Sequence, residues 1–107
     1  DNFTIMKEEP FGPLVPILTF KTFDEVIERA NDNDLGLCSY LYTSSMDKAH
    51  IGSEKLESGC VAVNTGVVAI AEAPFGGIKQ TGYGREGGSG AIKDYLNVKY
   101  THMGLKI

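Results

Sequence analysis

The sequence predicts an α/β fold built around a partial parallel sheet. Apolar runs typical of strands alternate along the chain with two amphipathic stretches typical of helices. Strands that alternate with short helices favour right-handed crossover connections, which place successive strands parallel. Hydrophobic residues make up 42% of the 107 residues and charged residues 22%, the profile of an ordinary globular domain. We therefore expect one domain at most.

Two strands are predicted near the beginning of the chain. The first is the short run FTIM at 3–6, and the second is LVPILTF at 14–20. The second run is apolar at successive positions, which is typical of a strand buried on both faces. Pro16 lacks an N–H group, so we expect it at the end or edge of this strand or beside a bulge.

The first helix is predicted over residues 23–31. Thr22 precedes this segment and Glu25 stands three positions later, which is the pattern of a capping box. Apolar side chains then recur at helical spacing from Phe23 to Ala30.

A second helix is predicted to follow Ser44 or Ser45, either of which suits the N-cap position. Gly52 lies inside this helix and favours a bend there. Gly59 is expected to end the segment in a left-handed conformation.

Two further strands, LCSYLYT at 37–43 and CVAVN at 60–64, flank the second helix. Each contains one cysteine, Cys38 and Cys60, at a spacing that matches no metal motif. The sequence favours two reduced, buried thiols over a disulfide. Cys60 has no visible partner that would lower its pKa, so we interpret it as an apolar filler and not as a nucleophile.

Residues 65–90 carry most of the glycines and are predicted as a long ordered loop, whose apolar part at 67–70 favours a functional role. GYGREGG at 82–88 lacks the preceding buried strand and the following helix of a dinucleotide-binding motif, so phosphate binding is disfavoured. Arg85 and Glu86 are predicted to form a hydrogen-bonded pair that organises this loop or an interface.

The chain is predicted to end with a short helix, AIKDYL at 91–96, and a strand, NVKYTHMGLKI at 97–107. That strand has no evident partner in the sequence, so either it adds to another chain's sheet or the chain is incomplete. The first residue is Asp1 and not Met, which also suggests a piece of something longer.

Charge and composition exclude several classes of function. The net charge is −4 and the basic residues are scattered singly, which argues against nucleic acid. Neither a membrane-length apolar run nor a secretory signal is visible, so we expect a cytoplasmic protein without membrane contact. His50 and His102 are expected to be structural or solvent-facing, and no nucleophile and base can be paired. No metal site is predicted.

Three motifs in one order resemble the C-terminal portion of the NAD(P)-dependent aldehyde dehydrogenase superfamily. They are EEPFGP at 8–13, VNTG at 63–66 and PFGGIKQTGYGREGG at 74–88. The NTG and APFGGIK segments and the closing DYLNVKYTHMGL are most similar to the succinate-semialdehyde dehydrogenase group. The resemblance implies an enzyme that oxidises an aldehyde to a carboxylate, with NAD or NADP as cofactor.

The resemblance also implies two regions. Residues 1–90 correspond to the C-terminal part of the catalytic domain, and residues 91–107 correspond to an oligomerisation arm that joins a neighbouring subunit in a dimer or tetramer. In the family a cysteine thiolate forms a thiohemiacetal, which passes hydride to the nicotinamide, and a glutamate base assists hydrolysis. Both groups would precede Asp1, so no catalytic residue is expected in this chain, and the 107 residues alone are predicted to be inactive.

For the cofactor, the resemblance assigns Glu9 to the hydroxyls of the nicotinamide ribose and Phe11 to the neighbourhood of the nicotinamide ring. A carboxylate suits this role because it accepts two strong O–H···O hydrogen bonds. Glu8 is expected to be a surface residue. Gly12 and Pro13 would fix the turn that directs the two cofactor-binding residues.

For the substrate, the resemblance assigns Ala69 and Ile70 to the aldehyde tunnel and Phe75 to its base. The succinate-semialdehyde group tends to place a serine in this loop for the distal carboxylate, whereas the side chains of Ala69 and Ile70 cannot donate a hydrogen bond. Succinate semialdehyde or a similar semialdehyde is the expected substrate, and a neutral aldehyde is an alternative. A non-catalytic oligomerisation or interaction module is the alternative from a different class.

Overall fold

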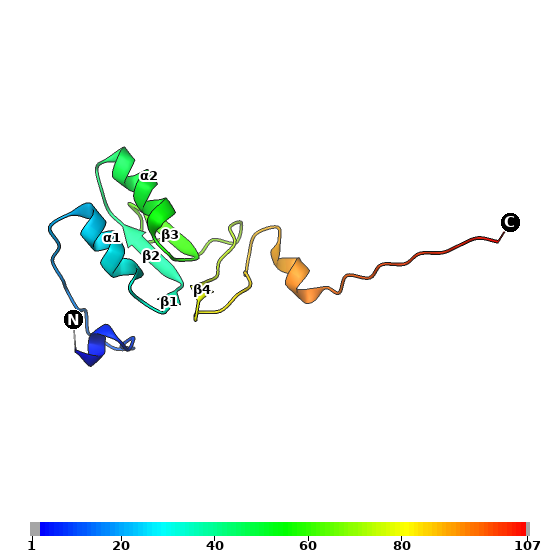
Figure 1. Ribbon diagram of the computed structural model, residues 1–107, viewed down its shortest axis with the longest axis horizontal. Coiled ribbons are helices and arrows are strands. Elements are labelled where there is room, and N and C mark those ends of the chain that lie inside the picture. Colours follow the sequence, from blue (N-terminus) through cyan, green and yellow to red (C-terminus); the bar gives the residue numbers. More distant parts are fainter. Residues whose placement is uncertain (1–2, 107) are drawn as a thin grey trace.

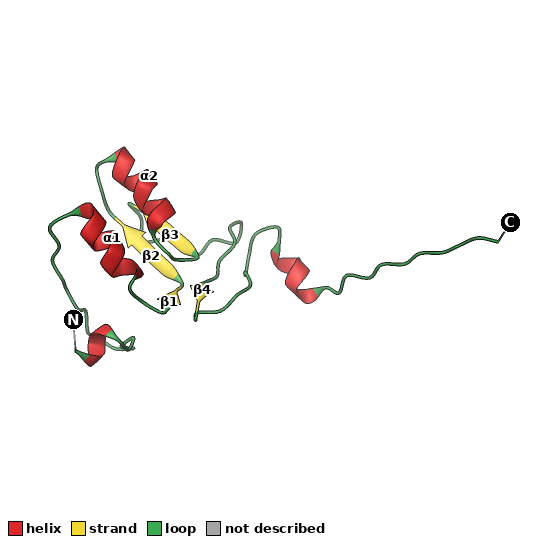
Figure 2. Ribbon diagram, in the orientation of Figure 1, coloured by secondary structure: helices red, strands yellow, loops and turns green. Residues whose placement is uncertain are grey.

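The computed structural model describes residues 3–106, and Asp1, Asn2 and Ile107 lie outside the described residues. The helices are η1 (Thr4–Met6), α1 (Phe23–Asn31), α2 (Met46–Lys55) and η2 (Ala91–Tyr95), of which η1 and η2 are 3-10 helices. The strands are β1 (Leu35–Gly36), β2 (Cys38–Leu41), β3 (Cys60–Val63) and β4 (Ile78–Lys79). Figures 1 and 2 show a small body of helices and strands from which the C-terminal segment extends.

The centre of the body is the parallel pair β2 and β3. Cys38 pairs with Cys60 at one end of the register, and Leu41 pairs with Val63 at the other. The helix α2 connects the two strands and packs on both of them. A second, antiparallel pair joins β1 to β4. The predicted α/β class and the parallel pairing of these two strands therefore agree with the structure.

The helix α1 has the predicted bounds and the predicted N-cap. The Thr22 side chain accepts a hydrogen bond from the Glu25 N–H at 3.2 Å. The Glu25 carboxylate accepts in return from the Lys21 N–H at 2.8 Å, one residue before the cap. Ile27 is 8% exposed, so this helix contributes one of the buried apolar side chains of the described core, and Ala62 on β3 is another.

The helix α2 begins as predicted but ends differently. Ser45 is its N-cap and accepts from the Lys48 N–H at 3.3 Å. The helix ends at Lys55 because Leu56 already has an extended backbone. Gly59 does not have the left-handed conformation that the sequence predicted, because it lies beyond the helix end, at the entry to β3.

The glycine at position 52 allows α2 to lie close to β2. It is buried, and a Cβ atom there would lie 2.5 Å from Leu41 Cδ2 and 3.3 Å from Phe23 Cζ. The smallest residue is therefore required by packing against the strand and against α1. This close packing explains why a glycine stands at position 52.

Two predicted strands near the beginning are wrong. Residues 4–6 form η1, and residues 14–20 form no strand. Val15 is 81% exposed and Ile17 is 85% exposed, so the second run is not buried. A strand requires a hydrogen-bonding neighbour, and none of residues 3–106 pairs with this segment.

The C-terminal segment forms a predicted short helix and then an extended tail. The helix is η2, and residues 97–106 are extended and exposed without strand pairing among the described residues. The tail gives the molecule its long axis, with extents of 75 × 34 × 23 Å (Figure 1). Across residues 3–106, no helix has the length and apolar character needed to cross a membrane.

Candidate functional site

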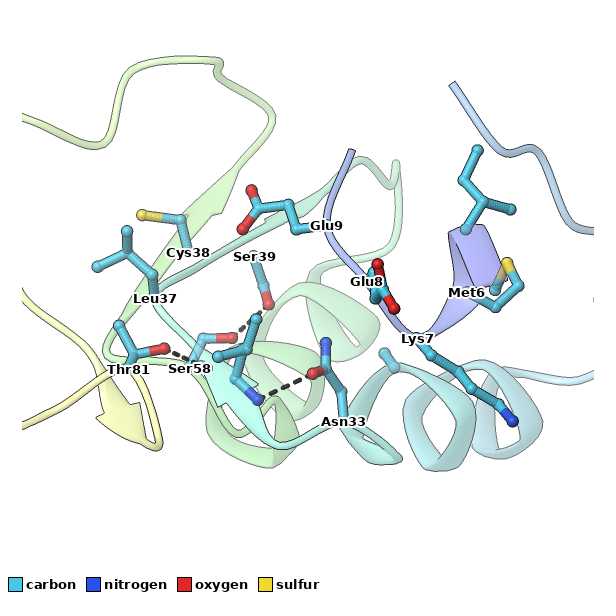
Figure 3. A pocket seen from close by; sticks show the side chains of 14 residues that line it. Met6, Lys7, Glu8, Glu9, Asn33, Leu37, Cys38, Ser39, Ser58 and Thr81 are labelled. Carbon is cyan, nitrogen blue, oxygen red and sulfur yellow. Dashed lines mark hydrogen bonds between the residues drawn. The ribbon is translucent and has the colours of Figure 1, made fainter. Parts of the chain in front are cut away.

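A cavity of about 480 Å³ opens where the N-terminal segment meets the first strands (Figure 3). Its wall comes from residues 5–9, from β1 and from the beginning of β2. Hydrogen bonds fix that wall: the Leu35 N–H donates to Asn33 Oδ1 at 2.8 Å, and the Gly36 N–H donates to Thr81 Oγ1 at 2.9 Å. The two carboxylates of the first motif, Glu8 and Glu9, both line this cavity.

The Glu9 side chain is exposed on the β2 side of the cavity, whereas Glu8 lies on the side of η1 (Figure 3). Within the described part of the chain, no hydrogen bond or ion pair is assigned to the Glu9 carboxylate. Its two oxygen atoms are thus available as acceptors. Phe11 is 97% exposed and lies on the turn at 10–14, where the Leu14 N–H donates to the Gly12 carbonyl at 2.8 Å.

The VNTG motif forms an anchored turn after β3. Asn64 has a left-handed backbone with φ of 55°. Its side chain accepts from the Thr43 N–H at 2.8 Å and donates to the Thr43 carbonyl at 2.9 Å. Asparagine tolerates the left-handed conformation. Its side-chain amide bonds both backbone groups of Thr43, as the backbone of a neighbouring strand would. The loop that follows therefore starts from a fixed point.

The predicted long loop is ordered by contacts with the glycine-rich segment. Phe75 and Glu86 exchange two backbone hydrogen bonds, each of 2.7 Å. The Gly88 N–H donates to the Ala71 carbonyl at 2.9 Å. Gly87 has φ of 67°, and a Cβ atom there would lie 2.8 Å from the Ala73 carbonyl oxygen. These glycines serve tight turns and close backbone contact within the loop.

Arg85 organises this loop, but not through Glu86. Its guanidinium donates to the carbonyl oxygen atoms of Gly77 at 2.9 Å and Gly84 at 2.6 Å. Its backbone N–H donates to the Asp94 carboxylate at 3.3 Å. The predicted pair of Arg85 with Glu86 is wrong, because the guanidinium donates to backbone carbonyls and Glu86 contributes its backbone to the bridge with Phe75.

The predicted substrate residues lie along one loop but do not share one cavity. Ile70 lines a cavity of about 220 Å³ together with Cys60 and Val67. Phe75 lines another cavity, of about 320 Å³, and Ala69 is exposed on the loop.

Sequence reasoning missed Lys79, which connects three distant parts of the body. Its ammonium group donates to the carbonyl oxygen atoms of Asn31 at 2.8 Å and Asn33 at 2.9 Å. The same group forms an ion pair with Glu57 at 2.6 Å. Lys79 also has a left-handed backbone, with φ of 56°. In the sequence, the only local feature of Lys79 is that it follows two glycines closely. That feature does not reveal its three partners.

The cysteines and histidines behave largely as predicted. Cys38 and Cys60 are free thiols, though half-buried and not fully buried. Burial raises the pKa of the Cys38 thiol, and the charge and hydrogen bond of Cys60 raise it further. His50 is exposed, and its Nε2 atom lies 3.7 Å from Glu54 Oε1. His102 is exposed on the tail. No group of three or more metal-binding side chains occurs among residues 3–106.

The class of protein follows from comparison with known families. Residues 1–101 match the model of the aldehyde dehydrogenase family. The chain therefore belongs to the aldehyde dehydrogenase family, and the family inferred from the three motifs is confirmed.

Individual relatives agree with this assignment. The NADP(+) succinate-semialdehyde dehydrogenase GabD of Escherichia coli is 46% identical over 104 residues, which cover 97% of this chain and 22% of the relative. The glutarate-semialdehyde dehydrogenase of Pseudomonas aeruginosa is 46% identical over 103 residues, with 96% and 21% coverage.

Solved structures give the same result. A crystal structure of an E. coli NADP-dependent enzyme has a TM-score of 0.91 at 46% identity and covers 97% of this chain and 22% of that one. The NAD+ complex of an aldehyde dehydrogenase from Bacillus cereus has a TM-score of 0.88 at 46% identity, with 92% and 20% coverage. The chain spans about a fifth of the length of these proteins.

Proposed function

We propose that this chain is the part of an NAD(P)-dependent aldehyde dehydrogenase that orients the cofactor and forms one wall of the aldehyde site. The observation that carries this proposal is the Glu9 carboxylate, which lines the cavity of about 480 Å³ with no assigned partner in the described residues. The 46% identity with the E. coli relative supports it over 97% of the chain.

The cavity suits one end of a dinucleotide and not the whole of it. Ligand cavities usually have volumes of about 300–1,000 Å³, and this one lies at the lower end of that range. The Glu9 carboxylate can accept two O–H hydrogen bonds from a ribose diol, which fixes the orientation of the attached ring. Phe11, two residues further along the chain, offers an exposed aromatic side chain for the nicotinamide ring. When bound, NAD or NADP accepts the hydride from the substrate carbon.

The substrate proposed for the longer enzyme is an aldehyde with a second acidic group. Relatives of this chain are named succinate-semialdehyde, glutarate-semialdehyde and 3-sulfolactaldehyde dehydrogenases. The side chains of Ala69 and Ile70 have no hydrogen-bond donor, so we expect cationic side chains elsewhere in the longer enzyme to bind the acidic group. The apolar surface of these two residues favours a neutral aldehyde as the second candidate.

We expect the two regions of this chain to have different roles in the longer enzyme. Residues 1–90 would complete a catalytic domain whose nucleophile and base lie outside this chain, so the 107 residues alone are expected to produce no NAD(P)H. Residues 91–107 would form an arm that pairs with a second subunit in a dimer or tetramer. Val98 and Tyr100 support this arm, because they are 102% and 86% exposed in the single chain.

A chimaera tests the proposed activity. In the E. coli relative, the aligned 104-residue segment is replaced by this chain, and NADP+ reduction is measured with succinate semialdehyde and with a neutral aldehyde of equal chain length. Turnover of both supports the family function, and preference for the semialdehyde supports the acidic substrate. A folded chimaera that reduces no NADP+ with either aldehyde would contradict the proposal and favour a non-catalytic module.

A further inference from the structure

Two thiols lie opposite each other at the beginning of the parallel pair β2 and β3. Cys38 on β2 and Cys60 on β3 are register partners in a parallel pair. Register partners on neighbouring strands project from the same face of a sheet, and the strands are about 4.7–4.9 Å apart. Ser39, the next residue, projects from the other face, where its hydroxyl hydrogen-bonds that of Ser58 (Figure 3). The cysteine face is therefore distinct from the serine face.

This thiol pair lies between the two cavities of the candidate site. Cys38 lines the cavity that contains Glu9, and Cys60 lines the cavity that contains Ile70. Both residues are half-buried and free. Cys60 Sγ donates a weak hydrogen bond to the Gly76 carbonyl at 3.6 Å, so this thiol also contacts the PFGG segment. A ligand on the two sulfur atoms would reach both cavities.

We propose that Cys38 and Cys60 form a dithiol site that binds one trivalent arsenic centre. A disulfide needs Cβ atoms about 3.5–4.5 Å apart, whereas residues directly opposite each other on neighbouring strands have Cβ atoms about 4.5–5.5 Å apart. One bridging atom between the sulfur atoms relieves this mismatch. Because no third metal-binding side chain joins the pair among residues 3–106, the site suits a centre that needs only two sulfur ligands.

The reaction with phenylarsine oxide balances without any change of oxidation state. Each thiol sulfur forms one bond to arsenic, the arsenic–oxygen bond breaks, and the oxygen leaves as water with the two thiol protons. Loss of the Cys60 proton would remove the hydrogen bond to Gly76.

The test is native mass spectrometry of the 107-residue chain with phenylarsine oxide, in the presence of excess glutathione as a monothiol competitor. The chain is expected to retain one phenylarsenic group, and Cys38→Ser and Cys60→Ser are each expected to lose it. Failure of the unsubstituted chain to retain the group would overturn the proposal.

A register variant separates a folded site from chelation by an unfolded chain. Cys38→Ser combined with Ser39→Cys keeps two thiols at almost the same sequence separation but places them on opposite faces of the sheet. We expect this variant to bind phenylarsine oxide at least tenfold more weakly than the original chain. Equal affinity of the two proteins would mean that the strand register contributes nothing, and would overturn the proposal.

Discussion

The backbone at Gly59 lies close against the backbone of Gly76. A Cβ atom at Gly59 would lie 1.9 Å from the Gly76 carbonyl oxygen, which is part of the backbone and cannot turn away. This contact brings the beginning of β3 against the PFGG segment. It also places that carbonyl within reach of the Cys60 thiol. One glycine thus positions the loop that the proposed substrate site requires.

Gly59→Ala is therefore expected to destabilise the chimaera by about 1–3 kcal/mol or more, because insertion into packed backbone forces the two segments apart. Gly90→Ala is the matched control, since no atom lies within 4 Å of its added Cβ and its φ of −89° suits any residue. Thermal unfolding measures both. Equal midpoints for the two variants would show that the Gly59 contact does not contribute to stability.

Glu25 provides a pH-dependent contact at the beginning of α1. The backbone N–H of Lys21 holds the pKa of its carboxyl below the usual 4.5, with smaller contributions from Thr22 and Arg29. Because the folded pKa is lowered, this stabilisation is present above pH 4.5 and is lost as the pH falls through the folded value.

An NMR titration of the labelled chain checks this direction. The Lys21 amide shift is expected to have a midpoint below pH 4.5, and Glu25→Gln is expected to abolish the transition. A midpoint above 4.5 in the original chain would contradict the contact.

At the scale of elements, the two longer helices could be predicted because their signals are local. The caps at Thr22 and Ser45 act within three residues of the helix start. The apolar run at 14–20 was wrongly predicted as a strand. A strand depends on a hydrogen-bonding neighbour, and none of the described residues supplies one. Lys79 was missed for the same reason: its partner Asn31 lies 48 positions away.

In the candidate site too, features set by a local motif could be predicted, and features set by contacts between distant segments could not. Glu9 and Phe11 could be proposed from a motif and its family resemblance, and the structure places Glu9 on the cavity wall. The separation of Ile70 and Phe75 into two cavities could not be predicted, because it depends on the bridge between Phe75 and Glu86. Loop conformation of this kind is set by contacts between segments and not by the sequence of the loop itself.

Thr22→Ala tests the cap of α1. Loss of the hydroxyl acceptor is expected to cost about 1 kcal/mol, since this is the typical effect of removing an N-cap side chain. Amide hydrogen exchange in the first turn of α1 within the chimaera should then accelerate about fivefold, whereas Thr22→Ser, which keeps the hydroxyl, should leave it nearly unchanged. Equal acceleration by both substitutions would show that the Thr22 methyl group, and not the hydrogen bond, matters.

At the scale of the whole molecule, the body is small and the tail is long. The radius of gyration is 19.5 Å, whereas a compact domain of about 100 residues has a value of about 13 Å. Large apolar side chains of the tail, including Val98, Tyr100 and Leu105, are exposed. An exposed apolar segment of this kind typically marks an interaction surface.

Removal of residues 96–107 from the chimaera tests the proposed arm. We expect the truncated protein to form a smaller assembly than the intact chimaera, measured by light scattering after size-exclusion chromatography. Retention of the original mass would contradict a role of the tail in subunit pairing.

The most direct test of the central claim compares Glu9→Gln with Glu8→Gln in the chimaera. Hydrogen bonds to a charged group contribute about 1.5–3 kcal/mol, so Glu9→Gln should lower kcat/KM for NADP+ reduction by about 10- to 100-fold. Glu8→Gln, which removes the other carboxylate that lines this cavity, should have little effect. If the two variants are equally active, Glu9 does not orient the cofactor and the proposed role of this chain is wrong.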